Sequence, residues 1–289
     1  MRRILIAPKL LLIGASLLLQ PGLAGSQETV SSPVHWAYAA YFGTGWYSVS
    51  GERDVFIFRM TPRWTRSEAS LDSDGKRVPG IYLKLPVSVG LDSFEFDDIP
   101  DAVAVDNVSY LSVNPGIDVE MPVNNIWDLR PYASIGYGQV LGESDSAWTY
   151  WGGIKSRVSL KAGKLNWRII NQIGFVGYSP SSGPSDAIWP VMAGLEFDYP
   201  LGGERTKGGP LLHWHSTYTV FGDDVDFRAS QTMIRPISDQ WEIGIAYSKQ
   251  DAPIRIWFLN FDRLGLGYRA SSNGDLKGVT FVFRSLFDE

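Results

Sequence analysis

Apolar and polar positions alternate most regularly between Leu111 and Val140. Successive side chains of a β-strand point to opposite faces, so this alternation predicts two antiparallel strands joined by a short turn at Val123 to Ile126. The apolar face of the second strand consists of Trp127, Leu129, Ala133, Ile135 and Tyr137. Its polar face consists of Asp128, Arg130, Tyr132, Ser134 and Gly136. One face therefore requires apolar surroundings, and the other requires water or polar partners.

The spacing of the aromatic residues indicates what surrounds the apolar face. Trp127 and Tyr137 are ten residues apart, and Trp189 and Tyr199 repeat this interval. At roughly 3.3 Å per residue and a tilt of about 40°, the two rings are separated by about 25 Å along a membrane normal. This is the height of the apolar band between the two aromatic girdles of an outer-membrane barrel. We expect these rings to lie at the two headgroup levels.

The same alternation recurs in twelve segments from Arg53 onward. They cover residues 53–64, 81–89, 111–121, 127–137, 148–160, 165–175, 189–199, 212–220, 225–233, 241–247, 264–268 and 279–287. A soluble sandwich also alternates, but it packs its apolar face against a second sheet. Here the apolar face carries aromatic residues near the strand ends, and the opposite face carries charge in almost every strand. The pattern predicts an all-β fold, a transmembrane antiparallel up-and-down β-barrel of twelve strands with a polar lumen.

Two further segments leave fourteen strands open as an alternative. Trp36 to Val49 is either a first strand or a segment threaded into the lumen, and Ile254 to Leu259 can form an extra short strand. If both chain ends lie in the periplasm, the strand number is even, so twelve strands require both segments to be something else. In this topology the acidic link Asp92 to Asn107 lies outside the cell, and the turn at Val123 to Ile126 lies in the periplasm.

Residues 1–24 are typical of a cleaved signal peptide. A basic end is followed by the apolar run Leu10 to Leu19 and by the small-residue cleavage site Gly22-Leu23-Ala24. Residues 25–52 are then a lead-in or a first strand, and residues 53–289 form the barrel. No later stretch offers about 18 consecutive apolar residues, which excludes a helical inner-membrane protein. Ser26 stands where a lipoprotein would carry cysteine, so we expect no lipid anchor of that kind and a location in the bacterial outer membrane.

Charge and composition narrow the partners. The chain has 26 basic and 31 acidic side chains, and the leader holds three of the basic ones, so the mature part has a net charge near −8. An acidic balance argues against nucleic acid as a partner. With no cysteine, a disulfide framework and a thiolate zinc site are excluded. The expected partners are outer-membrane lipid, lipopolysaccharide and the barrel-assembly machinery, while the oligomeric state stays open.

Three stretches carry a resemblance to a known family: YLKLPVSVGLDSFEFDDI (Tyr82 to Ile99), VNPGIDVEMPVNNIWDLRPYASIGYG, and SAWTYWGGIKSR (Ser146 to Arg157). The chain resembles the solitary outer-membrane autotransporter β-barrel family over roughly residues 53 to 287. The resemblance implies a passenger-less twelve-strand barrel, similar to an autotransporter translocator domain, in the outer membrane of a Gram-negative bacterium. It brings no catalytic residues with it.

The end of the sequence departs from that family, because Asp288 and Glu289 follow the aromatic residue on which such barrels usually finish. Phe287 continues the face of Phe281 and Phe283. We expect these three rings to face lipid as the signal that the assembly machinery recognises, with Asp288 and Glu289 as a periplasmic overhang.

Candidate chemistry is sparse. His213 and His215 both point into the lumen, where imidazoles can bind a metal, but no nearby acid completes a ligand set, so we interpret them as lumen-lining polar residues. Ser216 faces the opposite side of the same strand and cannot act with either histidine. The acids of the link 92–107 could bind calcium, although a solvated loop is the preferred interpretation. We therefore predict no catalytic, cofactor or metal site.

The polar face mixes both signs of charge, and buried ions must be paired, so the lumen could be filled by its own ion pairs. The predicted lumen-lining residues are Arg59, Arg63, Lys84, Asp118, Glu120, Arg130, Arg157, Arg168, Glu196, Asp198, His213, His215, Glu242, Arg263 and Arg269. The predicted aromatic girdles consist of Trp127, Tyr137, Trp148, Trp189, Tyr199, Trp241 and Tyr268. The first hypothesis is a barrel with a structural, transport or surface-interaction role. The alternatives are a small diffusion porin and an outer-membrane lipid-modifying enzyme.

Overall fold

The computed structural model describes residues 41–51, 53–71, 77–92, 110–142, 144–201, 209–228, 234–249, 253–256 and 259–289. The predicted signal peptide and nearly all of the acidic link 92–107 lie outside these residues. Within the described residues, no helix is long and apolar enough to cross a membrane.

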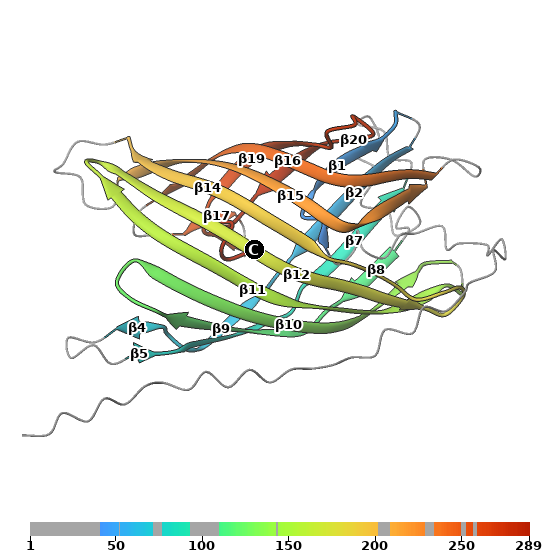
Figure 1. Cartoon of the computed structure of the whole chain (residues 1–289), viewed down its shortest axis with the longest axis horizontal. Coiled ribbons are helices and arrows are strands. Elements are labelled where there is room, and N and C mark those ends of the chain that lie inside the picture. The colour runs from blue at the N-terminus through green and yellow to red at the C-terminus, as the bar shows by residue number, and fades with distance from the viewer. Residues whose placement is uncertain are drawn as a thin grey trace, which may run out of the picture. The chain divides into compact units, whose positions relative to one another are not determined.

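Twelve antiparallel strands close into one barrel, which confirms the predicted fold class (Figure 1). Eight strands are continuous: β1 (Gly45–Val49), β10 (Trp127–Val140), β11 (Ser146–Ala162), β12 (Leu165–Pro180), β15 (Pro210–Arg228), β16 (Ile234–Lys249), β19 (Leu264–Ala270) and β20 (Leu276–Val282). Four are interrupted: β2 (Arg53–Met60) with β3 (Arg63–Ser67), β6 (Gly80–Lys84) with β7 (Val87–Asp92), β8 (Tyr110–Val113) with β9 (Gly116–Pro122), and β13 (Asp186–Ile188) with β14 (Pro190–Pro200). Because β1 pairs with both β2 and β20, the first and last strands close the ring.

Three of the interruptions lie side by side in the wall and each contains a proline, namely Pro62, Pro86 and Pro115. Proline has no backbone N–H to donate to the ladder, so it breaks a strand in the middle of a sheet. One backbone hydrogen bond at each proline joins the neighbouring strands here. Leu85 N donates to Pro62 O at 3.0 Å, Asn114 N to Pro86 O at 2.9 Å and Ile135 N to Pro115 O at 3.1 Å. The prolines therefore mark a line of weakened pairing that runs from β2 and β3 to β10.

The turn predicted at Val123 to Ile126 is confirmed, since Val123 N donates to Trp127 O at 2.8 Å. We call the end of the barrel at this turn the Asn124 end. The opposite end carries the turn at Gly142, where φ is +84°, and we call it the Gly142 end.

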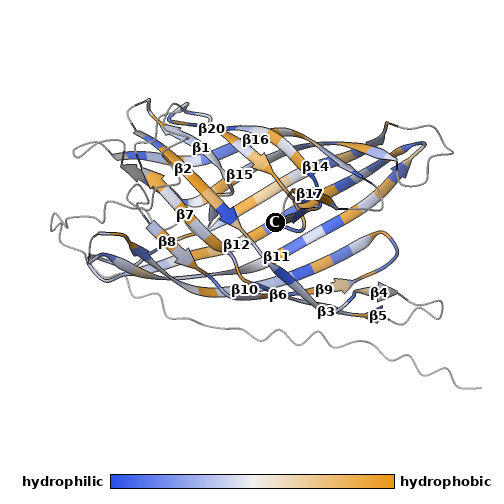
Figure 2. Ribbon diagram, turned by 180° about the vertical axis from the view of Figure 1, so that it is seen from behind, coloured by the Kyte–Doolittle hydropathy of each residue, from blue (hydrophilic) through white to orange (hydrophobic). Residues whose placement is uncertain are grey.

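Large apolar side chains stand exposed around the outside of the wall, for example Ile135 at 58% and Ile173 at 59%. Figure 2 shows how hydrophobic and hydrophilic residues follow one another along the strands. An exposed apolar surface that encircles a barrel is the surface that lipid covers. Of the predicted girdle residues, Trp127, Tyr137, Trp148, Trp189, Tyr199 and Tyr268 are exposed, and Trp241 is half-buried with its ring centroid 5.6 Å from that of Tyr268.

The strand count is correct, but the predicted composition of the twelve is wrong in two places. Residues 212–220 and 225–228 are not separate strands, because both belong to β15, which continues through an irregularity between Val220 and Val225. The missing strand is β1, so twelve strands do not require Trp36 to Val49 to be something else. Residues 254–256 form β17 (Ile254–Ile256), which pairs with β18 (Leu259–Phe261) in a small hairpin outside the barrel sheet, as β4 (Ser70–Leu71) does with β5 (Arg77–Val78).

Each of the two interpretations of Trp36 to Val49, a strand and a segment in the lumen, holds for a different part of that segment. Residues 45–49 are a barrel strand, whereas Phe42 is fully buried and packs against Tyr47 with 5.2 Å between ring centroids. The chain thus comes from the lumen into the wall at Gly45. Residues 36–40 lie outside the described residues.

The Gly142 end of the lumen is filled by apolar side chains rather than by charge. We call this cluster the apolar plug; it consists of Phe42, Tyr47, Val49, Ile57, Val176, Ile188, Phe221, Val225, Ile237 and Leu276. None of its members is more than 4% exposed. Val49 and Leu276 face each other across β1 and β20 next to the turns of this end. The polar lumen that the sequence predicts is therefore confined to the middle and to the Asn124 end.

Candidate functional site

At the Asn124 end, charges from three adjacent strands form an ion-pair network. Arg130 of β10 is 2% exposed and pairs with Glu120 of β9 through Nη2. Arg157 of β11 bridges Glu120 and Asp128, with 2.8 Å to a carboxylate oxygen of each. The β10–β11 register places Asp128 directly opposite Arg157, so the pairing follows from the sheet. Each carboxylate has a guanidinium partner, as burial in a narrow lumen requires.

The chain after β20 turns into the barrel and completes this network. Phe287 is fully buried, and its ring centroid lies 4.0 Å from Cζ of Arg130 and 4.2 Å from Cζ of Arg157. Asp288 pairs through Oδ1 with both Arg130 and Arg63 at 2.8 Å. We call residues 284–289 the inner segment. Within the inner segment, Phe287 places an aromatic face, and Asp288 a negative charge, among clustered cations.

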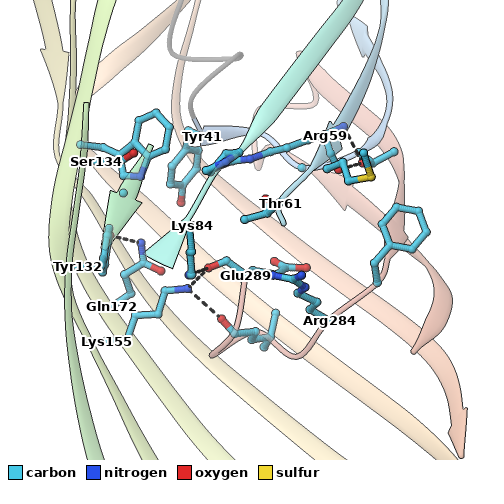
Figure 3. A pocket seen from close by; sticks show the side chains of 18 of the residues that line it. Tyr41, Arg59, Thr61, Lys84, Tyr132, Ser134, Lys155, Gln172, Arg284 and Glu289 are labelled. Carbon is cyan, nitrogen blue, oxygen red and sulfur yellow. Dashed lines mark hydrogen bonds between the residues drawn. The ribbon is translucent and has the colours of Figure 1, made fainter. Parts of the chain in front are cut away.

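Two lysines hold the inner segment by its backbone. Lys155 Nζ donates to Leu286 O at 3.2 Å and to Glu289 O at 2.8 Å. Lys84 pairs with Asp118 and also donates to Glu289 O at 3.4 Å. Figure 3 shows both ammonium groups converging on Glu289.

The expectation for the end of the sequence is therefore wrong. Strand β20 ends at Val282, and Phe287 lies inside the barrel instead of facing lipid on that strand. Asp288 and Glu289 are bound in the lumen and form no overhang. The reason is electrostatic. Cations of β3, β6, β10 and β11 bind the carboxylate of Asp288, the ring of Phe287 and the backbone carbonyls of this segment, and solvent would not provide these contacts together. Phe281 and Phe283 pack against Trp46 and Phe261, with ring centroids 5.6 and 5.0 Å apart respectively.

Burial alone would raise the pKa of the Asp288 carboxyl, but Arg130, Arg63 and a hydrogen bond from the Ser285 hydroxyl hold that pKa well below its usual value. Asp288 is thus an anion at neutral pH. The inner segment is tied to the wall by a permanent charge.

A second network spans β12, β14, β15 and β16 and includes Arg263, just before β19. Asp198 accepts a hydrogen bond from His213 Nδ1 at 2.6 Å, and His213 Nε2 lies 2.6 Å from the Ser248 hydroxyl. Arg168 pairs with Asp198 and with Glu196, and Arg263 also pairs with Glu196. The order Asp198, His213, Ser248 is that of an acid, a base and a nucleophile in hydrolases.

A third network lies nearer the middle of the lumen. Glu242 accepts from Thr280 Oγ1 at 3.0 Å, lies 3.0 Å from His215 Nε2 and pairs with Arg269. Gly244 leaves room for the imidazole, because a Cβ there would lie 2.2 Å from Cε1 of His215. Within the described part of the chain, no three His, Asp or Glu side chains come together as a metal site.

The structure places all the predicted lumen-lining residues on the inner side of the wall, in these networks or around the cavity described next. Sequence reasoning missed the part played by Ser248. The alternation puts Ser248 on the lumen face, but its contact with His213 depends on the register between β15 and β16 and on a histidine 35 residues earlier.

A cavity of about 400 Å³ lies between the apolar plug and the ion pairs of the Asn124 end. Its polar wall includes Tyr132, whose hydroxyl accepts a hydrogen bond from Gln172 Nε2 at 2.7 Å. Arg59 lies over the ring of Trp151, with Cζ 5.4 Å from the ring centroid. The size is that of a small-molecule site.

No protein-family model and no curated protein matches this sequence. The translocator domain of autotransporter NalP from Neisseria meningitidis is similar with a TM-score of 0.47 and 11% identity, over 82% of this chain and 82% of that chain. LpxR from Salmonella typhimurium is similar with a TM-score of 0.42 and 10% identity, over 81% of this chain and 91% of that chain. Likeness at this level carries nothing about activity or ligands.

The chain is an outer-membrane-type β-barrel. This conclusion rests on the closed ring of strands and on the apolar exterior. The twelve-strand barrel is also the fold that the autotransporter resemblance implies.

Proposed function

We propose that this protein is an integral barrel of the Gram-negative outer membrane with a structural or surface-interaction role, and that its lumen is not a diffusion path. A signal peptide in residues 1–24 would export it, and the barrel-assembly machinery would insert it among phospholipid and lipopolysaccharide. The observation that carries the proposal is the closure of the lumen at two levels, by the apolar plug at one end and by the inner segment with its ion pairs at the other.

Each level opposes ion flow for its own reason. The apolar plug carries one side-chain polar group, the Tyr47 hydroxyl, and this already donates to Gly43 O at 3.0 Å. A desolvated charge is costly in such surroundings. At the Asn124 end the charges that could line a channel are already paired, and the buried ring of Phe287 stands between Arg130 and Arg157. These features support a closed barrel over the porin hypothesis.

We expect the purified, refolded chain to show almost no current in a planar lipid bilayer. The measurement is single-channel conductance, with insertion verified by heat-modifiable migration of the same preparation. A general porin of similar strand number is the positive control. Steady open-channel steps in most insertions would contradict the proposal and restore the porin.

The hydrogen bonds that join Asp198, His213 and Ser248 resemble those of a hydrolase active site, so an enzymatic role has to be weighed. Its members are 3%, 4% and 5% exposed, and none of them lines the cavity. A nucleophile needs a surface on which a substrate can reach it. Since the described residues offer none here, we infer that the three side chains satisfy one another as buried polar groups must.

This inference predicts that a fluorophosphonate probe leaves the folded protein unlabelled. An esterase with an accessible active-site serine is the positive control, and the Ser248→Ala variant is the matched negative one. Labelling of the folded chain that disappears in Ser248→Ala would make Ser248 a nucleophile and revive the enzyme hypothesis.

A further inference from the structure

The cavity in the lumen reaches the outside of the wall. Among the residues that line it, Lys155 and Gln172 point into the lumen, whereas Phe58 is 40% exposed on the outer surface. Phe281, near the end of β20, and Phe283, just after that strand, line the same cavity. A path therefore connects the polar interior with the surface that lipid covers.

The path passes where the ring of strands is closed over only part of its height. Strand β1 begins at Gly45, which faces Ile57 of β2 on one side and Thr280 of β20 on the other. Thr44 makes the last bridge, since its carbonyl accepts from Phe281 N at 2.8 Å and its hydroxyl oxygen accepts from Arg59 N at 2.9 Å. Beyond Thr44, toward the Asn124 end, no described strand lies between residues 60–62 and 282–283. This is a lateral gap in the wall.

The inner part of the cavity carries an excess of positive charge. Its charged residues are the cations Arg59, Lys84, Lys155, Arg269 and Arg284 and the acids Asp118, Glu242 and Glu289. Asp118 already pairs with Lys84, and Glu242 already pairs with Arg269. Arg284 Nε lies 3.9 Å from the carboxylate of Asp262, an exposed residue that does not line the cavity. The balance favours an anionic guest over a cationic one.

Two of these cations have a buried N–H donor group without an acceptor among the described residues. Nη1 of Arg269 and Nη1 of Arg284 are buried and have no hydrogen-bond partner among the described residues. Buried polar groups are normally satisfied, so such nitrogen atoms call for an acceptor that the described residues do not supply. A carboxylate or phosphate oxygen is the acceptor that a guanidinium group binds best.

The mouth of the cavity has the opposite character. Phe58, Met60, Phe261, Phe281 and Phe283 surround the lateral gap with apolar side chains. Apolar residues around an opening toward lipid suit a hydrocarbon chain, and guanidinium groups behind them suit an acid.

We propose that the cavity binds a single-chain anionic amphiphile. Its acidic head lies among Arg59, Arg269 and Arg284, and its hydrocarbon chain leaves through the lateral gap between β2 and β20 into the membrane. A cavity of about 400 Å³ accommodates a head group with the first part of one chain. The head is a carboxylate, as in a fatty acid, or a phosphate monoester, as in lysophosphatidate.

The test is binding of radiolabelled oleate to the full chain in neutral detergent, with unlabelled competitors. Binding is expected to saturate, with oleate and lysophosphatidate displacing the label and the neutral oleyl alcohol displacing it at least about tenfold less well. Whichever acid competes at the lower concentration identifies the head group. Absence of saturable binding, or equal competition by oleyl alcohol, overturns the proposal.

Variants separate the site from general effects of charge. Arg59→Gln combined with Arg284→Gln is expected to weaken oleate binding by about tenfold or more. Lys249→Gln removes an exposed charge outside the cavity and should leave binding unchanged. Heat-modifiable migration establishes that each variant is folded. Equal affinity in the double variant and in Lys249→Gln overturns the assignment of the head group.

The direction of the bound chain is tested with nitroxide-labelled stearates. A nitroxide next to the carboxyl end should quench Trp151, which lines the cavity, and this part of the quenching should vanish in Trp151→Phe. A nitroxide at the methyl end should quench equally in both proteins. The reverse pattern would place the chain inside and the head outside, and would overturn the proposed orientation.

Discussion

Replacing Arg130 with methionine should lower the free energy of unfolding of the barrel by roughly 3 kcal/mol, the lower end of the cost of removing one partner from a buried ion pair. Arg130 serves Glu120, Asp288 and the carbonyl of Phe287 at once, and it is 2% exposed. The lower end is expected because Glu120 keeps Arg157 and Asp288 keeps Arg63. Urea unfolding in lipid, followed by tryptophan fluorescence, measures the change.

Arg235 provides the matched control. Its side chain is 41% exposed, and its Nε lies 4.0 Å from Asp275, which makes it a surface pair. Arg235→Met should therefore cost less than about 1 kcal/mol. Adding Glu120→Gln to Arg130→Met should recover part of the loss, because it removes the charge left without its main partner. If Arg130→Met costs no more than Arg235→Met, the network at the Asn124 end does not stabilise the barrel.

The membrane-facing half of this protein could be predicted because it depends on local alternation. Each residue from Trp127 to Tyr137 has its face fixed by the residues beside it, and the hydrophobic exterior imposes the same rule on every strand. Assigning the individual strands required more than local alternation. A strand as long as β15 has an irregularity between Val220 and Val225 that looks like a turn in the sequence, while β1 has only five residues and resembles a lead-in.

The contents of the lumen could not be predicted in the same way, because they depend on contacts between distant parts of the chain. Phe287 belongs to the alternation that starts at Phe281, and nothing local indicates that the chain leaves the sheet after Val282. The cations that attract it, Arg130 and Arg157, lie more than a hundred residues earlier. The apolar plug could not be predicted for a similar reason. An apolar residue on the inner face, such as Ile57, is an isolated exception in the sequence, and only the fold brings it into contact with the nine other members of the cluster.

Deleting residues 284–289 should open the Asn124 end without making the barrel a channel. The lumen has two seals in series, and the apolar plug stays in place when the inner segment is removed. Thr219 lines the cavity between the two seals and is 2% exposed, and the chain has no cysteine of its own. In a Thr219→Cys background, the deletion should speed labelling by a charged, membrane-impermeant thiol reagent about a hundredfold, which corresponds to the loss of about 2.7 kcal/mol of closure.

Two controls place the effect. Val225→Cys lies in the apolar plug, so its thiol should stay unlabelled with or without the inner segment, and Ser182→Cys, in an exposed turn, should be labelled rapidly in both. The full-length variant Phe287→Ala with Asp288→Asn keeps the chain but loses the ring and the charge that anchor it, and should label at an intermediate rate. Unchanged labelling at Thr219→Cys would show that the inner segment is not the seal. A steady current through the deletion variant would show instead that the apolar plug does not close the Gly142 end, because a single intact seal in series is enough to stop ions.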